Sequence, residues 1–388
     1  MKGASATVAA GFVLTALSYG LARFAYGLLL PQISADLDLS PVVAGWIGGS
    51  SFAAYCVGIV AALLLSGRFG ARLVGLLAGL AAAGGMALAS VAASGPVLGA
   101  GIALAGLSSG LTSPPLAAAV AARVETARRD RANGAINAGT AAGIVFSGLV
   151  AVAAIGSWRD IYGLFALIAA GVAAWMWWVL PGRGGGGAVR LSPALLARPG
   201  LPRLVAAAGL YGVAIAGTWT FGADILRERM HFSQMEIACA WVVLGVGGIA
   251  GVSTGSLLAR FGVAQTLRLA LLLTVISSAL LACGTSLPAV GYLSMALFGL
   301  AYIVATGTLL VWGIDRLPDR PDAGLAIPFL LVAAGQTIGA PLFGAVLQAT
   351  DTPSALFLFA VIACGGMVMP PTGPTDAAAS GPAPSPAA

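Results

Sequence analysis

Few residues in this chain could carry out acid–base, metal or nucleophilic chemistry. Its 388 residues include 13 Asp and Glu, one His and four Cys, and the cysteines lie in apolar runs without Cys-x-x-Cys spacing. This excludes a disulfide framework and a zinc site, and it leaves too few parts for most catalytic triads. The sequence also lacks the Gly-x-x-x-x-Gly-Lys-Ser/Thr loop that binds phosphates. We therefore expect no metal, no cofactor and no enzymatic activity.

The strongest candidate for a functional side chain is Arg23, which lies inside a long apolar stretch. A charged side chain there is costly unless it faces a cavity or a partner. Tyr19, Arg23 and Tyr26 are spaced i, i+4 and i+7, so on an α-helix they share one face. This stripe could offer a guanidinium fork and two hydroxyls to an anionic substrate. The alternative is structural: Arg23 bonds carbonyl groups or an acid of another helix.

The elements that carry these residues are predicted to be membrane-spanning helices. Hydrophobic residues make up 59% of the chain and charged residues 8%, whereas in soluble folds roughly a quarter of the residues are charged. About 20 apolar residues cross a bilayer as a helix, and continuous apolar runs exclude a β-barrel. The sequence thus predicts an all-α polytopic membrane protein with twelve transmembrane helices. These spans are 7–30, 42–65, 73–93, 97–120, 134–155, 161–180, 203–225, 236–258, 266–285, 289–313, 324–348 and 354–370.

The distribution of basic residues predicts the orientation of the chain. Lys and Arg number 19, and apart from Arg23 they fall in predicted loops or at the termini. With loops assigned to alternate sides, one side receives only Arg159, Arg227 and Arg229. The positive-inside rule makes that side external and both termini cytoplasmic. The net charge of +6 is thus a topology signal rather than a nucleic-acid surface. We expect a monomeric, multi-pass protein of the plasma membrane, the inner membrane of a bacterium.

The loop between the sixth and seventh predicted spans divides the chain near its midpoint. Residues 181–202 are rich in Gly, Pro and Arg, which is typical of a flexible hinge. We therefore expect two pseudo-symmetric six-helix bundles, one over 1–180 and one over 203–370. The tail 371–388, rich in Pro, Ala, Ser and Gly, is expected to be disordered.

Short motifs recur in both predicted bundles at nearly constant spacing. The motif "SGRFGAR", with Arg68, Gly70 and Arg72, is matched 192 residues later by "LARFGVA", with Arg260 and Gly262. Three glycines of the fifth span recur 196 residues later in the eleventh: Gly139, Gly143 and Gly148 match Gly335, Gly339 and Gly344. These offsets, close to half the chain length, indicate a duplicated six-helix unit. Parallel halves of this kind commonly form alternating-access transporters.

These features resemble the major facilitator superfamily of secondary transporters over almost the whole chain. The loop after the second span looks like the family signature of Gly, three residues, Asp-Arg, one residue, Gly and basic residues, with Leu63 and Gly67 departing from it. "SWRDIY", which opens the sixth span, is similar to a frequent turn of the superfamily. Within it, "YGLARFAYGLLLPQI", "YGVAIAGTWTF" and Trp241 with Gly245 look most like the YbfB/YjiJ-type transporters.

The resemblance implies that spans 1, 4, 7 and 10 line a central cavity. Besides Arg23, Tyr19 and Tyr26, the candidate substrate-binding residues on these spans are Ser109, Thr112, Thr218, Trp219, Tyr302 and Thr306. Conformational or gating roles are expected for the repeated loop motif and for spans 5 and 11, although the glycines there could serve close packing alone. These candidates are Arg68, Gly70, Arg72, Arg260, Gly262, Gly139, Gly143, Gly335, Gly339 and Pro341.

Proton coupling has little support in the sequence, because no Asp or Glu lies near the centre of a predicted span. Asp224, near the outer end of the seventh span, is the nearest acid that could couple protons. We therefore expect any coupling proton to travel with the substrate or with an acid at the end of a span.

The sequence favours a secondary active transporter that moves a small organic solute by alternating access. Arg23 favours an anionic or amphipathic metabolite, whereas an apolar aromatic cavity favours a drug or metabolite efflux antiporter. A membrane sensor and a membrane-embedded transferase are alternatives of other classes, but a transferase would need clustered Asp, His or Glu, which the sequence lacks. The expected partners are a small-molecule substrate, a coupling proton and the lipid bilayer, without nucleic acid.

Overall fold

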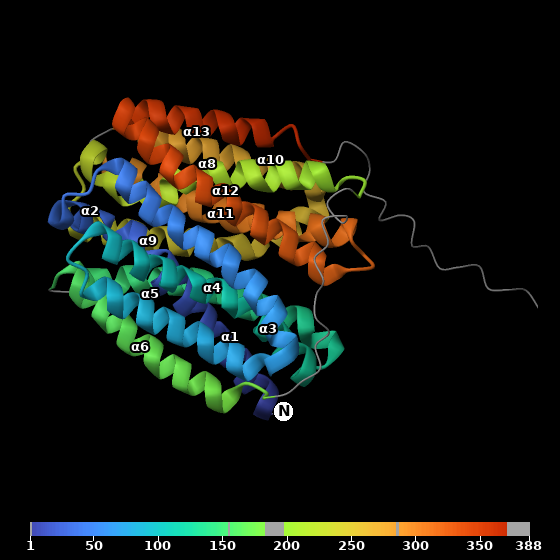
Figure 1. Ribbon diagram of the computed structural model, residues 1–388. Coiled ribbons are helices and arrows are strands. Elements are labelled where there is room, and N and C mark those ends of the chain that lie inside the picture. Colours follow the sequence, from blue (N-terminus) through green and yellow to red (C-terminus); the bar gives the residue numbers. More distant parts are fainter. Residues whose placement is uncertain (1, 154–155, 183–197, 285–286, 371–388) are drawn as a thin grey trace, which may run out of the picture.

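The computed structural model describes residues 2–153, 156–182, 198–284 and 287–370, and these ranges contain helices and loops without a strand (Figure 1). The elements are α1 Lys2–Thr15, the π-helix η1 Ala16–Arg23, α2 Ala25–Leu37, α3 Pro41–Ser90, α4 Gly95–Arg123, η2 Thr126–Arg128, α5 Arg129–Ala153, α6 Trp158–Val179, α8 Leu201–Met230, α9 Gln234–Ala250, η3 Gly251–Ser253, α10 Thr254–Cys283, α11 Pro288–Arg316, α12 Pro321–Ala349 and α13 Thr352–Gly366. We refer below to the described residues up to 182 as the N-terminal half and to those from 198 as the C-terminal half.

Two of the predicted segments are not fully covered by this description. Most of the predicted hinge 181–202 lies outside the described residues, because positions 183–197 are among those left out. The predicted disordered tail 371–388 lies wholly outside them.

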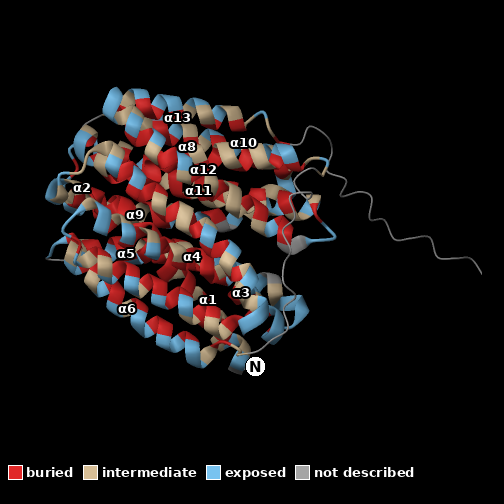
Figure 2. Ribbon diagram, in the orientation of Figure 1, coloured by how far each residue is buried: buried red, intermediate tan, exposed pale blue. Residues whose placement is uncertain are grey.

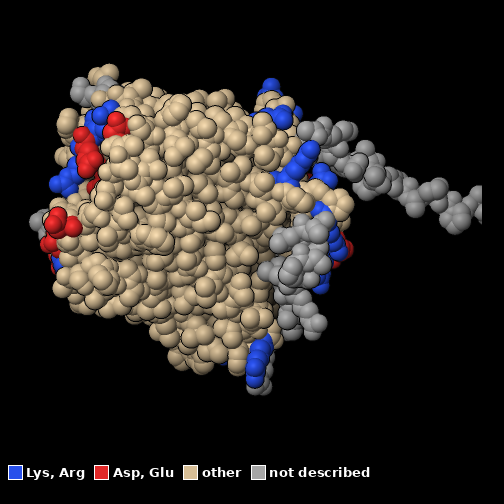
Figure 3. Space-filling model, turned by 45° about the horizontal axis from the view of Figure 1, so that its top comes forward, with Lys and Arg blue, Asp and Glu red and all other residues tan. Residues whose placement is uncertain are grey.

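The outer surface is suited to a bilayer. Nine described helical segments are long and apolar enough to cross a membrane, and α9 and α13 are shorter apolar helices. On the face shown in Figure 3, charged residues gather at two opposite ends and leave an uncharged belt between them. Large apolar side chains such as Leu167, Trp178 and Phe357 are more than 70% exposed, which an apolar surrounding makes favourable. Buried residues line the helix faces that point inward (Figure 2).

Glycines break two long helices at matching places in the halves. The predicted span 42–65 and most of 73–93 lie on the 50-residue helix α3, which ends at Ser90 and whose direction changes at Gly70 (φ 81°, ψ 169°). In α10 the same break occurs at Gly262 (φ 72°, ψ 174°). Both residues adopt a positive φ that side chains disfavour, which explains why glycine stands at each.

The first predicted span, 7–30, is longer and less regular than expected. It runs from α1 through η1 into α2, and the π-helical segment Ala16–Arg23 interrupts the α-helical hydrogen bonding. A Cβ atom on Gly20 would collide with the backbone of Gly143 in α5. The first span therefore approaches α5 closely in the same segment that carries Arg23.

Two of the three repeated glycine pairs of spans 5 and 11 make equivalent contacts within each half. A Cβ atom on Gly143 would meet the carbonyl oxygen of Ala16 in η1, and one on Gly339 would lie 2.7 Å from that of Val213 in α8. The preceding glycines of each pair are similarly placed: Gly139 lies against Phe12, and Gly335 against Gly209. Each glycine thus allows its helix to approach the first span of its own half.

The two halves also contact each other along tightly packed helix pairs. The helices α3 and α12 lie side by side (Figure 1), and a Cβ atom on Gly45 would stand 2.6 Å from the carbonyl oxygen of Ala340. The helices α5 and α9 form a second pair, in which Gly245 packs on Val145. These two pairs join the N-terminal half to the C-terminal half along α3 with α12 and α5 with α9.

Candidate functional site

Arg23 is buried where the N-terminal and C-terminal halves meet. It ends η1, only 5% of its surface is exposed, and one terminal guanidinium nitrogen donates a 2.8 Å hydrogen bond to Oε1 of Gln336 on α12. The Gln336 side chain has no exposed surface. The structural alternative raised by the sequence, a bond to another helix, is therefore partly realised, although the acceptor is an amide rather than an acid.

Four aromatic rings surround the guanidinium group. Its carbon lies 4.2 Å from the ring centroid of Tyr55, 4.8 Å from Phe52, 5.1 Å from Phe24 and 5.7 Å from Tyr19. At these distances the negative ring faces attract a cation. Rings can lower the cost of burying the charge, but they do not accept the strong in-plane hydrogen bonds that a carboxylate accepts.

The positive charge of Arg23 has no acidic partner among the described residues. The ion pairs in this part of the chain join other residues: Arg128 with Glu125, Arg159 with Asp36, and Arg198 with Asp319. Moreover, Nε of Arg23 and Nε2 of Gln336 are buried without a hydrogen-bond partner. The site thus combines a buried cation with two unused donors, which suits the recognition of an anion.

The predicted stripe of Tyr19, Arg23 and Tyr26 is only partly brought together. The Tyr19 hydroxyl lies 3.2 Å from the Tyr55 hydroxyl and 3.2 Å from Oγ of Ser113, so it belongs to the surroundings of Arg23. Tyr26 instead donates to the carbonyl oxygen of Ala44 at 3.0 Å. The expectation of one shared face assumed a regular α-helix, and the π-helical segment alters the spacing between these side chains.

Two predicted residues of the C-terminal half join the aromatic cluster through Phe24. Trp219 on α8 stacks on Phe24, with ring centroids 3.9 Å apart and an interplanar angle of 19°. Tyr302 on α11 meets Trp219 edge-on at 5.0 Å and Phe24 at 6.0 Å. The cluster therefore draws residues from the predicted spans 1, 7 and 10.

The remaining predicted polar residues are mainly engaged within their own helices. Ser109 donates to the Gly106 carbonyl oxygen, and Thr306 donates to that of Tyr302. Thr112 bonds the Ser108 carbonyl oxygen and also Oγ of Ser18 in η1, both at 2.8 Å. Thr218 is buried on α8 beside Trp219. Such bonds to the preceding turn satisfy a hydroxyl group without a ligand.

The predicted gating arginines behave differently from one another. Arg68 and Arg260 each lie over the phenylalanine that follows them, at 5.3 Å and 5.1 Å from its ring centroid. Arg72 donates from Nε to the carbonyl oxygen of Leu180, at the end of α6, at 3.0 Å.

A matching bond in the C-terminal half escaped the sequence analysis. Arg268, in the middle of α10 and six residues after Gly262, donates from Nε to the carbonyl oxygen of Met367 just beyond α13, at 3.2 Å. Like Arg72 in the N-terminal half, Arg268 thus links the helical segment that follows the glycine break to the end of the last helix of its half.

Asp224, the candidate coupling acid, lies far along α8 and is half-buried. It forms no ion pair with a described residue, and the nearby Arg227 donates to the carbonyl oxygen of Pro31 in α2 at 2.8 Å. The structure thus does not bring Asp224 into the aromatic cluster around Arg23.

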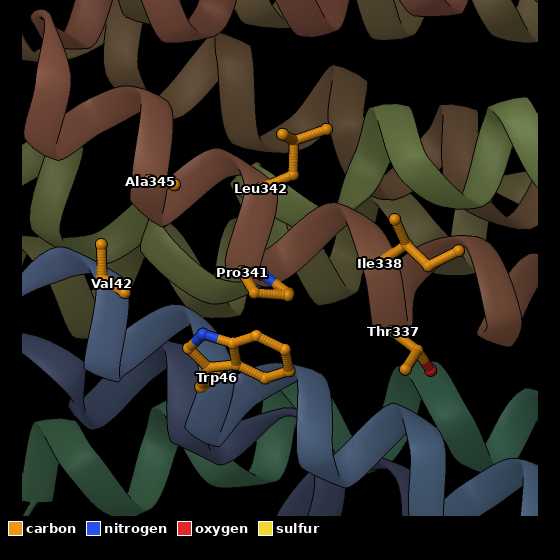
Figure 4. Close-up of a pocket in the computed structure, with 7 residues that line it drawn as sticks. All are labelled: Val42, Trp46, Thr337, Ile338, Pro341, Leu342 and Ala345. Atoms are coloured by element: carbon orange, nitrogen blue, oxygen red, sulfur yellow. The ribbon is translucent and has the colours of Figure 1, made fainter.

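Pro341 contributes to a shallow pocket on the surface between α3 and α12 rather than to the central site. The pocket encloses about 430 Å³ and is lined by Val42, Trp46, Thr337, Ile338, Pro341, Leu342 and Ala345 (Figure 4). Trp46 is 64% exposed. Because its lining is almost wholly apolar, this pocket lacks groups that would orient a polar solute.

Gln336 and the rings of Phe24, Phe52 and Tyr55 were not among the residues predicted for the site. Gln336 carried a usable signal, because it is an amide in the middle of the apolar run "LLVAAGQTIGAP". Buried polar side chains within a membrane need a partner, so the unpaired Gln336 and the unpaired Arg23 could have been matched. Phe24 and Phe52 carried no comparable signal.

The helical fold, the apolar belt and a buried cation between two halves define a polytopic membrane transport protein. The sequence matches the Major Facilitator Superfamily over residues 12–329, and the chain belongs to this family. Its members are transporters, so the protein is a secondary transporter and not an enzyme.

Solved transporter structures share the fold. A crystal structure of the nucleoside transporter NupG is similar with a TM-score of 0.76 at 15% identity, covering 95% of this chain and 99% of that one. A bacterial homolog of the human lysosomal transporter Spinster, in an inward-facing and occupied conformation, is similar with a TM-score of 0.76 at 14% identity, covering 95% and 96%. At such identities the likeness concerns the fold alone. No curated protein matches the sequence.

Proposed function

We propose that the protein moves a small organic anion, or an amphipathic metabolite with an anionic group, across the membrane by alternating access. The observation that carries the proposal is Arg23: a buried guanidinium that has no acidic partner among the described residues and is held between the two halves by Gln336. Burial without a counter-charge is costly, and a bound anion would remove that cost. The aromatic rings around it would contact the apolar body of the solute.

The proposed architecture has twelve spans in two six-helix bundles, 1–180 and 203–370, connected by 181–202 and monomeric in the plasma membrane of a bacterium. The break at Gly70 supports this count, because it allows the 50-residue helix α3 to supply two spans. Both termini are cytoplasmic in this proposal, following the positive-inside rule. We also propose the YbfB/YjiJ-type branch, on the sequence motifs alone.

Contacts between the halves support an inward-facing state. Arg227 donates to the Pro31 carbonyl oxygen, and the backbone nitrogen of Val42 donates to Oε1 of Gln348 at 3.4 Å. These residues lie at the end assigned to the outside by the positive-inside rule. These contacts hold the outer end closed, and rocking of the bundles would open it.

Coupling to protons is proposed to pass through the substrate or through Asp224. The described surroundings of Arg23 contain no carboxylate that could exchange a proton there. Asp224 is the half-buried acid nearest to the outer end of α8. Replacement by Asn would abolish pH-driven accumulation only if Asp224 rather than the substrate carries the proton.

Counterflow in proteoliposomes tests the transport proposal. Vesicles preloaded with an unlabelled organic acid should accumulate the same labelled acid, because a carrier exchanges solute across the membrane. A panel of short aliphatic and aromatic acids, with neutral amides as matched controls, covers the proposed substrate class. If wild-type vesicles exchange none of these solutes, or exchange acids and amides equally, the proposal of an anion carrier is wrong.

Efflux is the second candidate, and the stacked rings of Phe24 and Trp219 favour it because they suit an apolar export substrate. Inverted membrane vesicles separate the two directions. An efflux antiporter would load labelled aromatic acids into such vesicles when their lumen is acidic, whereas an uptake carrier would not.

A further inference from the structure

Gln336 is the nearest polar neighbour of Arg23, and its position suggests more than a structural bond. Its Oε1 accepts from a terminal nitrogen of Arg23 at 2.8 Å, while its own Nε2 is buried without a partner. The adjacent Nε of Arg23 is also buried without a partner. Each partner of the Arg23–Gln336 hydrogen bond therefore has one buried donor that is still available to a ligand.

Unpaired donors of this kind are costly, since burial removes the water that would satisfy them. A neutral amide oxygen is also a weaker partner for a guanidinium than a carboxylate, which accepts two parallel hydrogen bonds and carries the opposite charge. The hydrogen bond from Arg23 to Gln336 is thus weaker than the one that a carboxylate would form at the same place. Both orphan donors would be satisfied by one planar anion with two oxygens.

The surroundings limit the charge and the shape of that anion. Among the described residues, the guanidinium of Arg23 is the cation that lies over the rings of Tyr19, Phe24, Phe52 and Tyr55. One negative charge on a bound solute therefore neutralises the site. The other groups around it are apolar rings and phenol hydroxyls. A second carboxylate or a phosphate dianion would be left without a counter-charge, which is unfavourable away from water.

We propose that the site takes a monocarboxylate and that Gln336 is a substrate-recognition residue. The carboxylate replaces Oε1 of Gln336 on the guanidinium, and the freed amide turns so that Nε2 donates to a carboxylate oxygen. In the empty carrier Gln336 thus bonds Arg23 directly, and in the loaded carrier the solute bridges Arg23 of the N-terminal half and Gln336 of the C-terminal half. This inference rests on the proposed transport function and names its substrate class.

Replacing Gln336 with Glu places a carboxylate of the protein itself beside Arg23. We expect this variant to bind benzoate at least about tenfold more weakly than the wild type, because the new ion pair occupies the guanidinium. The same variant should unfold at a higher temperature, because the buried charge is now paired. Gln265→Glu, at an exposed position of α10, is the matched control and should bind benzoate as the wild type does.

Binding is measured on purified protein by the quenching of tryptophan fluorescence, since Trp219 stacks on Phe24 beside the site. Benzamide, which has the same ring but no charge, should not compete with benzoate in the wild type, and this comparison needs no variant. Gln336→Leu should weaken benzoate binding about tenfold, because it removes the donor but keeps the guanidinium. Unchanged benzoate affinity in both Gln336 variants, or equal binding of benzamide, would overturn the proposal.

The outcomes also separate this inference from the proposed transport function. Counterflow of a neutral solute in wild-type vesicles without benzoate binding would leave a transporter but refute the monocarboxylate site. Binding of benzoate that depends on Gln336, without counterflow of any solute, would support the site and refute transport.

Discussion

Gly143 in the N-terminal half and Gly339 in the C-terminal half occupy matching places 196 residues apart, and each lies against the first span of its own half. Arg23 has no such counterpart. Gly143 contacts Ala16 and Gly339 contacts Val213, which lies 197 positions after Ala16. The position 197 residues after Arg23 is Thr220. The helix packing is thus repeated, whereas the buried charge is present once.

This difference separates two groups of residues. The repeated packing contacts, which we call the frame, hold the helices of each moving bundle together, and the unrepeated residues select a solute. Repeated contacts serve both halves equally, and alternating access requires two bundles that can rock against each other. A ligand has no internal symmetry to match, so the residues that bind it need not be repeated. The comparison predicts that substitutions in the frame act alike in both halves, whereas substitutions at the site do not.

The largest effect is expected from filling the glycine contacts. Gly143→Leu and Gly339→Leu should each abolish counterflow, because a side chain at either position collides with backbone of the first span of that half. Gly134→Leu on α5 and Gly255→Leu on α10 are the controls, since open space surrounds their Cβ positions. Loss of counterflow in one of the two variants alone would break the equivalence of the halves.

A smaller effect is expected at the matched arginine bonds. Arg72→Ala and Arg268→Ala each remove a hydrogen bond to a carbonyl oxygen at the end of the last helix of their half. Each variant should lose about 1 kcal/mol of stability, and the two losses should be similar. The midpoint of unfolding of the purified protein measures this, with the exposed Arg131→Ala as the control. A loss confined to Arg72→Ala would show that this part of the frame is not shared.

The smallest effect is expected at Asp319, whose ion pair belongs to the C-terminal half alone. Arg198 holds both carboxylate oxygens at 2.7 Å and 3.0 Å and lowers the pKa of Asp319 from its ordinary value. A lowered pKa means that the pair stabilises the fold above the ordinary pKa of an Asp and is lost as the pH falls through the lowered value. Asp319→Asn should therefore remove a small acid-dependent loss of stability below about pH 4, seen by circular dichroism. An identical acid profile in this variant would show that the exposed pair contributes nothing.

Much of the helical arrangement could be predicted because an apolar run within a membrane must form its backbone hydrogen bonds internally, as a helix does. The predicted span 97–120 lies within Gly95–Arg123, and 203–225 lies within Leu201–Met230. The sequence predicted a loop between the spans 42–65 and 73–93, and the non-helical backbone at Gly70 lies between them.

The site was less predictable because it depends on contacts between distant segments. The π-helical form of Ala16–Arg23 accompanies close packing against Gly143, which no local pattern encodes. It moved Tyr26 away from the group that an α-helical period suggested. Likewise Gln336 stood out in the sequence as an amide within an apolar run, but its hydrogen bond to Arg23, 313 residues away, depends on the fold.

The central claim is that the unrepeated Arg23 is the anion-binding residue of the carrier, and counterflow of labelled benzoate tests it most directly. Arg23→Ala, Arg23→Lys and the counterpart variant Thr220→Ala are reconstituted beside the wild type. We predict that Arg23→Ala accumulates no label, that Arg23→Lys retains a fraction, and that Thr220→Ala matches the wild type within about twofold, as expected for a position without a charge. Equal accumulation by Arg23→Ala and the wild type would contradict the account.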